Sequence, residues 1–198
     1  FIDDKAIAQL STGDMFFFSG ISLAVVTPEH RPLFWQMVEK LKHAGVRIVF
    51  DPNYRARMWD SPEQAKEQFD QAFSLSDVAL PGVDDFQQLY DIHTSEGVYD
   101  YCKAFNLKEL IIKNGEQGIL CYIDAQVYQF NITPVKNVVD TTSAGDSFNG
   151  VYLGARANGL TISHAIELAS SAAGFVIQHP GAIVNKTAYQ QFMAQQIR

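Results

Sequence analysis

Asp146 is the residue with the clearest chemical potential, because three small residues, Ser143, Ala144 and Gly145, precede it where a helix is predicted to begin. The first N–H groups of a helix have no partner inside it and carry the positive end of its dipole, so they attract anions. A carboxylate beside such an anion can act as the base that takes a proton from a hydroxyl attacking phosphorus. The alternative is an ordinary carboxylate that caps the helix. The spacing alone leaves both interpretations open.

A second candidate segment follows the predicted strand at residues 46–50 and contains Asn53, Tyr54 and Arg55, with Arg57 close behind. Arginines and an amide at the end of a strand can bind a carboxylate or a phosphate, because the planar guanidinium matches two acceptor oxygens. The alternative is a solvated surface loop. The residues by themselves do not decide between the two.

Three shorter segments also follow predicted elements. One of them holds two glycines and a lysine after a predicted strand, in the run Lys113, Asn114, Gly115, Glu116, Gln117 and Gly118. Such a loop suits a close approach to a nucleotide, although similar turns commonly start hairpins. The acidic pair Asp84 and Asp85 follows another strand, and helix N-capping is one explanation for it. Gly181 and Ala182 follow a long predicted helix, where a helix stop is the simple interpretation.

The composition restricts the class of protein. A chain of 198 residues with 47% hydrophobic residues can bury a sizeable core in one domain. The net charge of −7 argues against nucleic acid or an anionic membrane surface as a partner. The two cysteines lack C-x-x-C spacing and the five histidines lack metal-ligand spacing, so neither a disulfide framework nor a zinc site is indicated. The apolar runs are too short for a membrane span, so we expect a cytoplasmic protein.

Predicted strands and helices alternate along the chain. Strands are predicted at 15–18, 46–50, 78–80 and 110–112 and in a hairpin of 119–122 with 127–130, and helices at about 28–44, 62–73, 86–89, 95–105, 145–158 and 162–178, with a short one near the end. This alternation implies right-handed crossovers and a mostly parallel sheet covered on both faces. Ligands of such sheets gather beyond the carboxyl ends of the strands, where several of the candidate segments lie.

The run from Asp140 to Phe148, Asp-Thr-Thr-Ser-Ala-Gly-Asp-Ser-Phe, resembles the C-terminal signature of the ribokinase-like (pfkB-type) carbohydrate kinases. Two positions depart from the usual form, since Ser143 replaces a frequent glycine and Val151 stands where alanine or glycine is usual. The resemblance implies a three-layer α/β/α fold, ATP as the phosphoryl donor and Mg²⁺ as the cofactor. It also implies that Asp146 is the catalytic base at the substrate hydroxyl and that the backbone of 143–146 stabilises charge on the transferred phosphoryl group.

A narrower resemblance covers the segment from Asp51 to Trp59, Asp-Pro-Asn-Tyr-Arg-Ala-Arg-Met-Trp. It is similar to the corresponding loop of the 2-keto-3-deoxygluconate kinases, a branch of the family whose sugar carries a carboxylate. This similarity implies that Arg55 contacts the sugar acid and that Asn53, Tyr54 and Arg55 also lie against the nucleotide. Arg57 is the second choice for the carboxylate.

The same family resemblance implies a role for each of the three shorter segments. Residues 113–118 resemble the family's nucleotide loop, and Gly181 with Ala182 resembles the turn that lies against adenine. Relatives often carry an Asn-x-x-Glu run that organises magnesium and phosphate through water, where this chain has Gly82 and Asp85. The amide is therefore absent and the acid is shorter by one methylene. A role for Asp84 or Asp85 near Mg²⁺ and a role in helix N-capping both stay open.

The resemblance covers nearly all of the chain but only the C-terminal portion of a family member. We therefore expect residues 1–198 to be the C-terminal part of a single ribokinase-like kinase domain. By this resemblance, the N-terminal strands are missing, together with a β lid that often mediates dimerisation. The predicted function is ATP-dependent phosphorylation of 2-keto-3-deoxygluconate at its 6-hydroxyl. The alternatives are a kinase for a neutral sugar, such as fructose or ribose, and a non-catalytic nucleotide-binding module.

Overall fold

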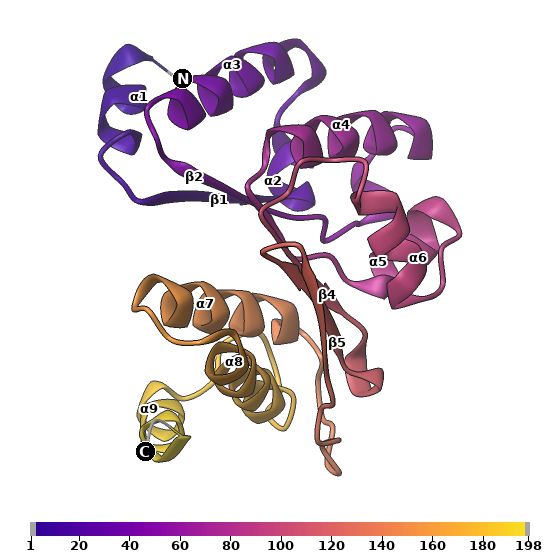
Figure 1. Cartoon of the computed structure of the whole chain (residues 1–198), viewed down its shortest axis with the longest axis vertical. Helices are drawn as coiled ribbons and strands as arrows, with labels where there is room; N and C mark the ends of the chain where they lie inside the picture. The colour runs from indigo at the N-terminus through magenta and orange to yellow at the C-terminus, as the bar shows by residue number, and fades with distance from the viewer. Residues whose placement is uncertain (1–2, 197–198) are drawn as a thin grey trace. The chain divides into compact units, whose positions relative to one another are not determined.

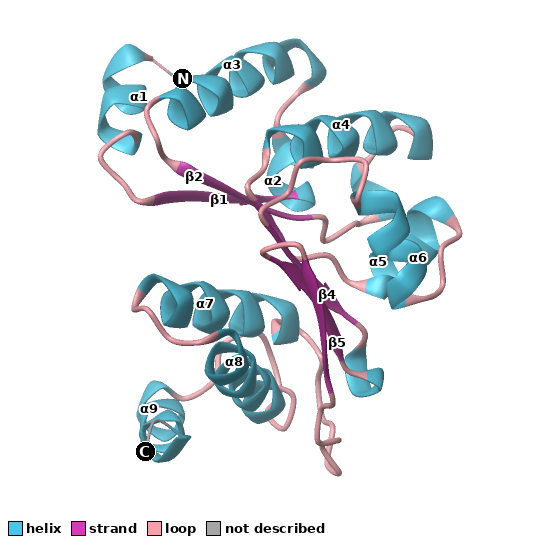
Figure 2. Cartoon of the chain, viewed as in Figure 1, coloured by secondary structure: helices cyan, strands magenta, loops and turns pink. Residues whose placement is uncertain are grey.

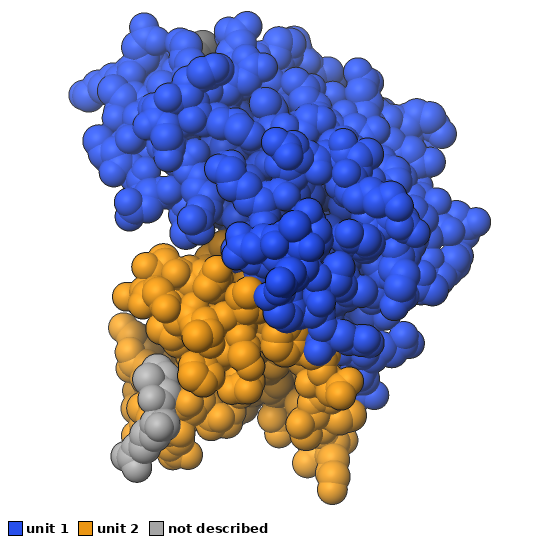
Figure 3. Space-filling view, viewed as in Figure 1, with its two compact units in different colours: residues 1–129 blue, residues 130–198 orange. Residues whose placement is uncertain are grey.

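The computed structural model describes residues 3–196, and the chain divides into two compact units (Figure 3). Unit 1 is Phe1–Gln129 and unit 2 is Phe130–Arg198. Unit 1 contains the sheet strands and the segment of residues 51–59, which is predicted to bind the sugar acid and is called the sugar-acid segment below. Unit 2 contains the helix whose first turn, around residues 143–146, is predicted to bind an anion and is called the anion site below.

Among residues 3–196, six strands form one sheet and lie in sequence order (Figure 2). The strands are β1 (Met15–Ser19), β2 (Arg47–Asp51), β3 (Val78–Ala79), β4 (Glu109–Lys113), β5 (Ile119–Ile123) and β6 (Gln126–Phe130). Strands β1 to β4 pair in parallel, and β5 runs antiparallel to β4. Strands β1 and β2 end level with each other, because Ser19 pairs with Asp51, and beyond β3 an isolated bridge joins Gly82 to Lys113 at the end of β4. The predicted mostly parallel sheet is confirmed.

Helices connect the parallel strands of unit 1 (Figure 1). The connections contain α2 (Gly20–Val25), α3 (Arg31–His43), α4 (Pro62–Leu75), α5 (Val83–Tyr90) and α6 (Ser95–Cys102), with the short 3₁₀ helices η1 (Pro28–His30) and η2 (Ala56–Met58). Helix α1 (Asp4–Leu10) precedes β1, and the 3₁₀ helix η3 (Gly115–Gln117) lies between β4 and β5. Because the strand order follows the sequence and crossovers are right-handed, α3 to α6 pack on one face of the sheet.

Aromatic side chains form much of the core on that face. The Phe50 ring of β2 contacts Phe69 and Phe73 of α4, with ring centroids 5.4 Å and 5.2 Å away and edge-to-face geometry. All three side chains are fully buried. Burying each ring contributes roughly 1.5–3 kcal/mol, which fixes β2 firmly beneath α4. The segment that follows β2 therefore leaves the sheet from a rigid anchor.

The hairpin of β5 and β6 turns through Asp124 and Ala125, which both have positive φ, 52° and 61°. Positive φ at both central residues is the geometry of the two-residue turns that match the twist of paired strands. The predicted hairpin is confirmed. The strands extend one residue further toward the turn than the sequence pattern indicated.

Unit 2 contains the helices α7 (Ala144–Ala157), α8 (Ile162–Val176) and α9 (Lys186–Gln196). Helix α8 begins after Thr161, whose side chain accepts a hydrogen bond from the His164 N–H, as an N-cap residue does. Helices α7 and α8 pack against each other. The two long helices predicted at 145–158 and 162–178 and the short one near the end are confirmed.

Two helices of unit 1 were not predicted. Helix α1 is short and has no buried residues, so it carries no periodic apolar signal. Helix α2 (six residues) begins at Gly20, directly after β1, and is too short to show a clear helical period. Its N-terminus is fixed by a reciprocal pair of hydrogen bonds between Ser19 and Ser22. The usual signature of this capping box has Glu or Gln at the third helical position, and a serine there conceals it.

Both cysteines lie in the core. Cys102 and Cys121 are buried and free, and burial raises the pKa of both thiols.

The helices among residues 3–196 are all too short or too polar to cross a membrane.

Gly20 is required at the point where β1 passes beside the segment after β2. A Cβ atom added there would lie 1.9 Å from the Pro52 carbonyl oxygen and 2.6 Å from the Phe69 ring. Gly20→Ala must therefore displace backbone, and we expect it to lower the free energy of unfolding of the full-length protein by about 1–3 kcal/mol. Urea denaturation followed by circular dichroism measures this change.

Gly154→Ala is the matched control for that substitution, because a Cβ at Gly154 meets nothing within 4 Å. Gly154 lies inside α7, where alanine is favoured over glycine by roughly 0.5–1 kcal/mol. The control should therefore be neutral or stabilising. A stable Gly20→Ala variant would show that the Pro52 carbonyl moves freely.

Candidate active site

The predicted anion site lies at the first turn of α7 (Figure 1). Ser143 precedes the helix in the left-handed conformation, with φ 63°, which glycine adopts without strain and serine does not. The Ala144 N–H donates to the Thr141 carbonyl at 3.2 Å. Within residues 3–196, the N–H groups of Gly145 and Asp146 have no acceptor. The turn therefore offers two free donors where a glycine-like bend exposes the backbone.

The Asp146 side chain is exposed in that first helical turn, and it has no hydrogen-bond or ion-pair partner in the described part of the chain. A carboxylate in this place gains from the helix dipole whether or not it has a chemical role. Its freedom from partners leaves both oxygens available to a hydroxyl. This arrangement meets the first geometric requirement of a general base.

Asp140 links the turn before α7 to the turn after α8. Its carboxylate accepts hydrogen bonds from the Thr142 N–H at 2.8 Å and from the Gly181 N–H at 2.9 Å. These bonds, chiefly those from Thr142, hold the pKa of the Asp140 carboxyl below its usual range. The structure thus brings Gly181 beside the anion-site loop. The sequence did not indicate this role, although Asp140 is the first residue of the motif at 140–148.

In unit 1, oppositely charged residues meet where the parallel strands end. The Lys113 ammonium at the end of β4 lies 3.4 Å from the Asp51 carboxylate at the end of β2. Asp51 is only 3% exposed. Sequence analysis placed Lys113 in a nucleotide loop and gave Asp51 no role. The position of Asp51, a charged residue directly after the predicted strand at 46–50, was the sequence feature that could have indicated its place at the site.

Asp85 belongs to the same group of side chains. Its Oδ1 atom accepts a hydrogen bond from the Tyr54 N–H at 2.8 Å and lies 3.9 Å from Nη1 of Arg55. Burial, together with the nearby Asp51 carboxylate, raises the pKa of Asp85 to about 6. The N-cap residue of α5 is Gly82, so the Asp85 side chain binds a distant loop instead of capping its own helix.

The predicted sugar-acid segment divides into a buried and an exposed part. Tyr54 is 3% exposed, and its ring meets Phe69 edge-to-face at 6.1 Å. Asn53 has a positive φ of 35°, which turns the chain sharply after β2. The Arg55 side chain is 54% exposed, and its Nη1 donates to the Tyr54 carbonyl at 2.7 Å. Arg57 is exposed in η2. Arg55 is therefore held at one nitrogen while the rest of its guanidinium faces solvent.

The predicted nucleotide loop is shaped by its two glycines. Gly115 and Gly118 have positive φ, 49° and 107°, and the Asn114 N–H donates to the Gly118 carbonyl at 3.0 Å. The Asn114 side chain donates to Ser95 and to Gln117. Glu116 and Gln117 are exposed. Of this loop, the described contacts bring only Lys113 into the charged group at the strand ends.

Residues 3–196 contain no cluster of three or more His, Cys, Asp or Glu side chains arranged as a metal cage. Mg²⁺ that accompanies a nucleotide needs only one or two carboxylates, since phosphates and waters supply its other ligands. Asp84 is exposed and has no partner in the described chain, and one oxygen of Asp85 is engaged by Tyr54. Asp84 and the second oxygen of Asp85 are therefore the carboxylate oxygens of this segment that have no partner within residues 3–196 and that Mg²⁺ could use.

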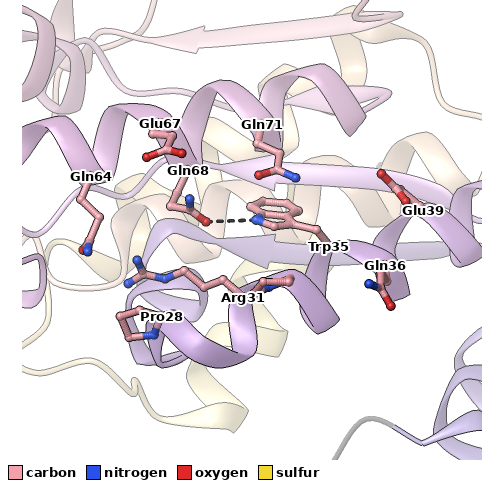
Figure 4. A pocket seen from close by; sticks show the side chains of 10 residues that line it. Pro28, Arg31, Trp35, Gln36, Glu39, Gln64, Glu67, Gln68 and Gln71 are labelled. Carbon is pink, nitrogen blue, oxygen red and sulfur yellow. Dashed lines mark hydrogen bonds between the residues drawn. The ribbon is translucent and has the colours of Figure 1, made fainter.

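A polar groove of about 480 Å³ lies between α3 and α4, and none of the residues that line it is a sequence-predicted site residue (Figure 4). Its floor includes Trp35, whose indole N–H donates to the Gln68 amide oxygen at 3.0 Å, and the nearly buried Arg31. The Arg31 guanidinium also lies 5.1 Å from the Trp59 ring. These contacts pack α3 against α4 and against the loop that precedes α4.

Known proteins resemble this chain over most of its length. A family model described as pfkB family carbohydrate kinase matches residues 2–188. The 2-dehydro-3-deoxygluconokinase of Haemophilus influenzae is 34% identical over 194 residues, and the alignment covers 96% of this chain and 62% of that protein. The chain therefore spans less than two thirds of the length of this relative. The substrate in that name is the compound also called 2-keto-3-deoxygluconate.

Two solved structures share the fold at lower identity. The aminoimidazole riboside kinase from Salmonella enterica, complexed with aminoimidazole riboside and an ATP analogue, has a TM-score of 0.76 at 23% identity and aligns over 91% of this chain and 62% of its own. The 2-dehydro-3-deoxygluconokinase from Thermotoga maritima has a TM-score of 0.74 at 21% identity, over 93% and 61%. The predicted three-layer α/β/α fold class with a mostly parallel sheet is thereby confirmed.

Proposed function

The chain belongs to the pfkB family of carbohydrate kinases, and on that premise we propose that the full-length protein transfers the γ-phosphoryl group of ATP to a sugar acid. The proposed substrate is 2-keto-3-deoxygluconate, and the proposed acceptor is its 6-hydroxyl. The observation that carries the proposal is the first turn of α7, where two free backbone N–H groups lie beside the unpartnered carboxylate of Asp146. A transferred phosphoryl group needs both a positive environment and a base at the attacking hydroxyl.

In this mechanism Asp146 accepts the proton of the sugar hydroxyl as its oxygen attacks the γ-phosphorus in line with the leaving oxygen. The N–H groups of Gly145 and Asp146 bind the oxygens on which negative charge develops, and the α7 dipole supports them. Asp84 and Asp85 are the residues that would hold the water shell of Mg²⁺, which would supply positive charge to the phosphates when it is bound.

Arg55 is the proposed partner of the sugar carboxylate. One of its nitrogens is occupied by the Tyr54 carbonyl, and within the described chain its remaining N–H groups have no acceptor. A guanidinium of this kind can bind a carboxylate with two hydrogen bonds. A neutral sugar would not require it. The relative of 34% identity, named as a 2-dehydro-3-deoxygluconokinase, supports the same substrate.

The nucleotide is proposed to contact the remaining segments. These are Asn53, Tyr54 and the loop Lys113, Asn114, Gly115, Glu116, Gln117 and Gly118 in unit 1, and Gly181 with Ala182 in unit 2. The positive φ values of Gly115, Gly118 and Gly181 support such contacts, because they expose backbone without a side chain. ATP is a cytoplasmic substrate, so we propose that the protein acts in the cytoplasm on small molecules.

Substrate profiling of the full-length protein tests this proposal. Initial rates with ATP and Mg²⁺ would be measured on 2-keto-3-deoxygluconate, fructose and ribose by coupling ADP formation to NADH oxidation. We expect the highest kcat/KM on the sugar acid. A higher value on fructose or ribose would favour the neutral-sugar kinase. Nucleotide binding in a titration with no turnover of any sugar would favour a non-catalytic module.

A further inference from the structure

We propose that Asp85 is a positioning residue that sets the preference for a carboxylated sugar by holding the Tyr54–Arg55 segment. The inference rests on the proposed function, since it concerns how Arg55 is presented to the sugar acid. It adds a role that the sequence did not indicate, because Asp85 comes from α5 and the segment follows β2.

The contacts of Asp85 join two parts of the chain that are 31 residues apart. Its Oδ1 atom accepts the Tyr54 N–H at 2.8 Å, and the same oxygen lies 3.9 Å from Nη1 of Arg55. Arg55 Nη1 in turn donates to the Tyr54 carbonyl at 2.7 Å. One carboxylate oxygen therefore fixes the backbone on one side of Arg55 and attracts its side chain as well.

Arg55 needs such support because most of its side chain is free to move. Its side chain is 54% exposed, whereas that of Asp85 is 15% exposed. A long exposed arginine loses rotamer freedom when it binds a ligand, and this loss weakens binding unless the side chain is already restrained. Asp85 and the Tyr54 carbonyl restrain one nitrogen and leave the rest of the guanidinium for the ligand.

The Asp85 carboxylate makes its contacts outside its own helix. The N-cap residue of α5 is Gly82, so Asp85 does not cap α5, and its side chain is largely buried against the segment that follows β2. Asparagine has nearly the same shape and would still accept the Tyr54 N–H.

Two substitutions at Asp85 separate its effects, measured in the full-length enzyme on 2-keto-3-deoxygluconate and on the best neutral sugar. We expect Asp85→Ala to lower the ratio of the two kcat/KM values about 10-fold, the effect of losing one hydrogen bond to a charged group. Asp85→Asn keeps an acceptor for Tyr54 and should lower the ratio by about 2- to 5-fold. Thermal unfolding of each variant, compared with that of the unmodified protein, checks that the changed ratio is not the result of a folding defect.

The matched control is Glu96→Gln, which removes an exposed carboxylate from the first turn of the neighbouring helix α6. It should leave the ratio unchanged. A double variant tests whether Asp85 acts through Arg55, since Asp85→Ala should add no further loss of the ratio when Arg55→Ala is already present.

Two results would overturn the role of Asp85. The first is a ratio that stays unchanged or rises in Asp85→Ala, including equal losses on both sugars, the pattern of a group that serves only the nucleotide or Mg²⁺. The second is a lowered ratio that persists in full beside Arg55→Ala. An unmodified enzyme without preference for the sugar acid would instead overturn the proposed substrate, and this inference with it.

Discussion

Asp146→Asn should lower kcat for the sugar acid by roughly 10²–10⁴-fold in the full-length enzyme, the range typical of a lost general base. Asparagine has nearly the same shape but cannot accept the proton of the attacking hydroxyl. The Asp146 side chain is exposed and makes no contact that the described chain would lose. We therefore expect nearly unchanged folding and nucleotide affinity, measured by thermal unfolding and by titration with ATP.

The control for this substitution is Glu167→Gln, which neutralises an exposed carboxylate of α8 in the same unit. It should leave kcat unchanged. Steady-state kinetics at saturating ATP and sugar measure both variants. Turnover of Asp146→Asn within a few-fold of the unmodified enzyme would remove Asp146 from the mechanism. It would leave the first turn of α7 as an anion site alone.

Arg55→Lys should lower kcat/KM for 2-keto-3-deoxygluconate by roughly 10- to 150-fold. A hydrogen bond to a charged group contributes about 1.5–3 kcal/mol, and lysine cannot reproduce the planar pair of donors. The loss on a neutral sugar should be much smaller, because that substrate has no carboxylate to lose its partner. Initial-rate kinetics on both sugars give the comparison.

The contrast between substrates decides the result, because Arg55 is also a proposed nucleotide contact. Equal losses on acidic and neutral sugars would assign Arg55 to the nucleotide. Arg57→Lys is the matched control, since Arg57 is also exposed and lies two residues away. A selective loss in Arg57→Lys instead would transfer the sugar carboxylate to that residue.

Local patterns determined most of the fold. The apolar runs that became β1, β2 and β4 were identified because they are short, continuous and followed by turn residues. The start of α7 was identified because small residues and a carboxylate precede a long helical pattern. Helices α1 and α2 were not predicted from the sequence, because neither has the length or the apolar periodicity by which a helix is recognised.

The partners of the charged site residues were decided only by the tertiary structure. Asp85 and Tyr54 are 31 residues apart, Asp140 and Gly181 are 41 apart, and Asp51 and Lys113 are 62 apart. Sequence rules relate a residue to neighbours within a few positions along a helix, strand or turn. The crossovers of the parallel sheet bring the ends of distant strands together, and the packing of helices brings distant turns together. The sequence motifs therefore identified Asp146 and Arg55 as candidates, whereas the contacts by which Asp85 and Asp140 hold distant loops in place were revealed only by the folded structure.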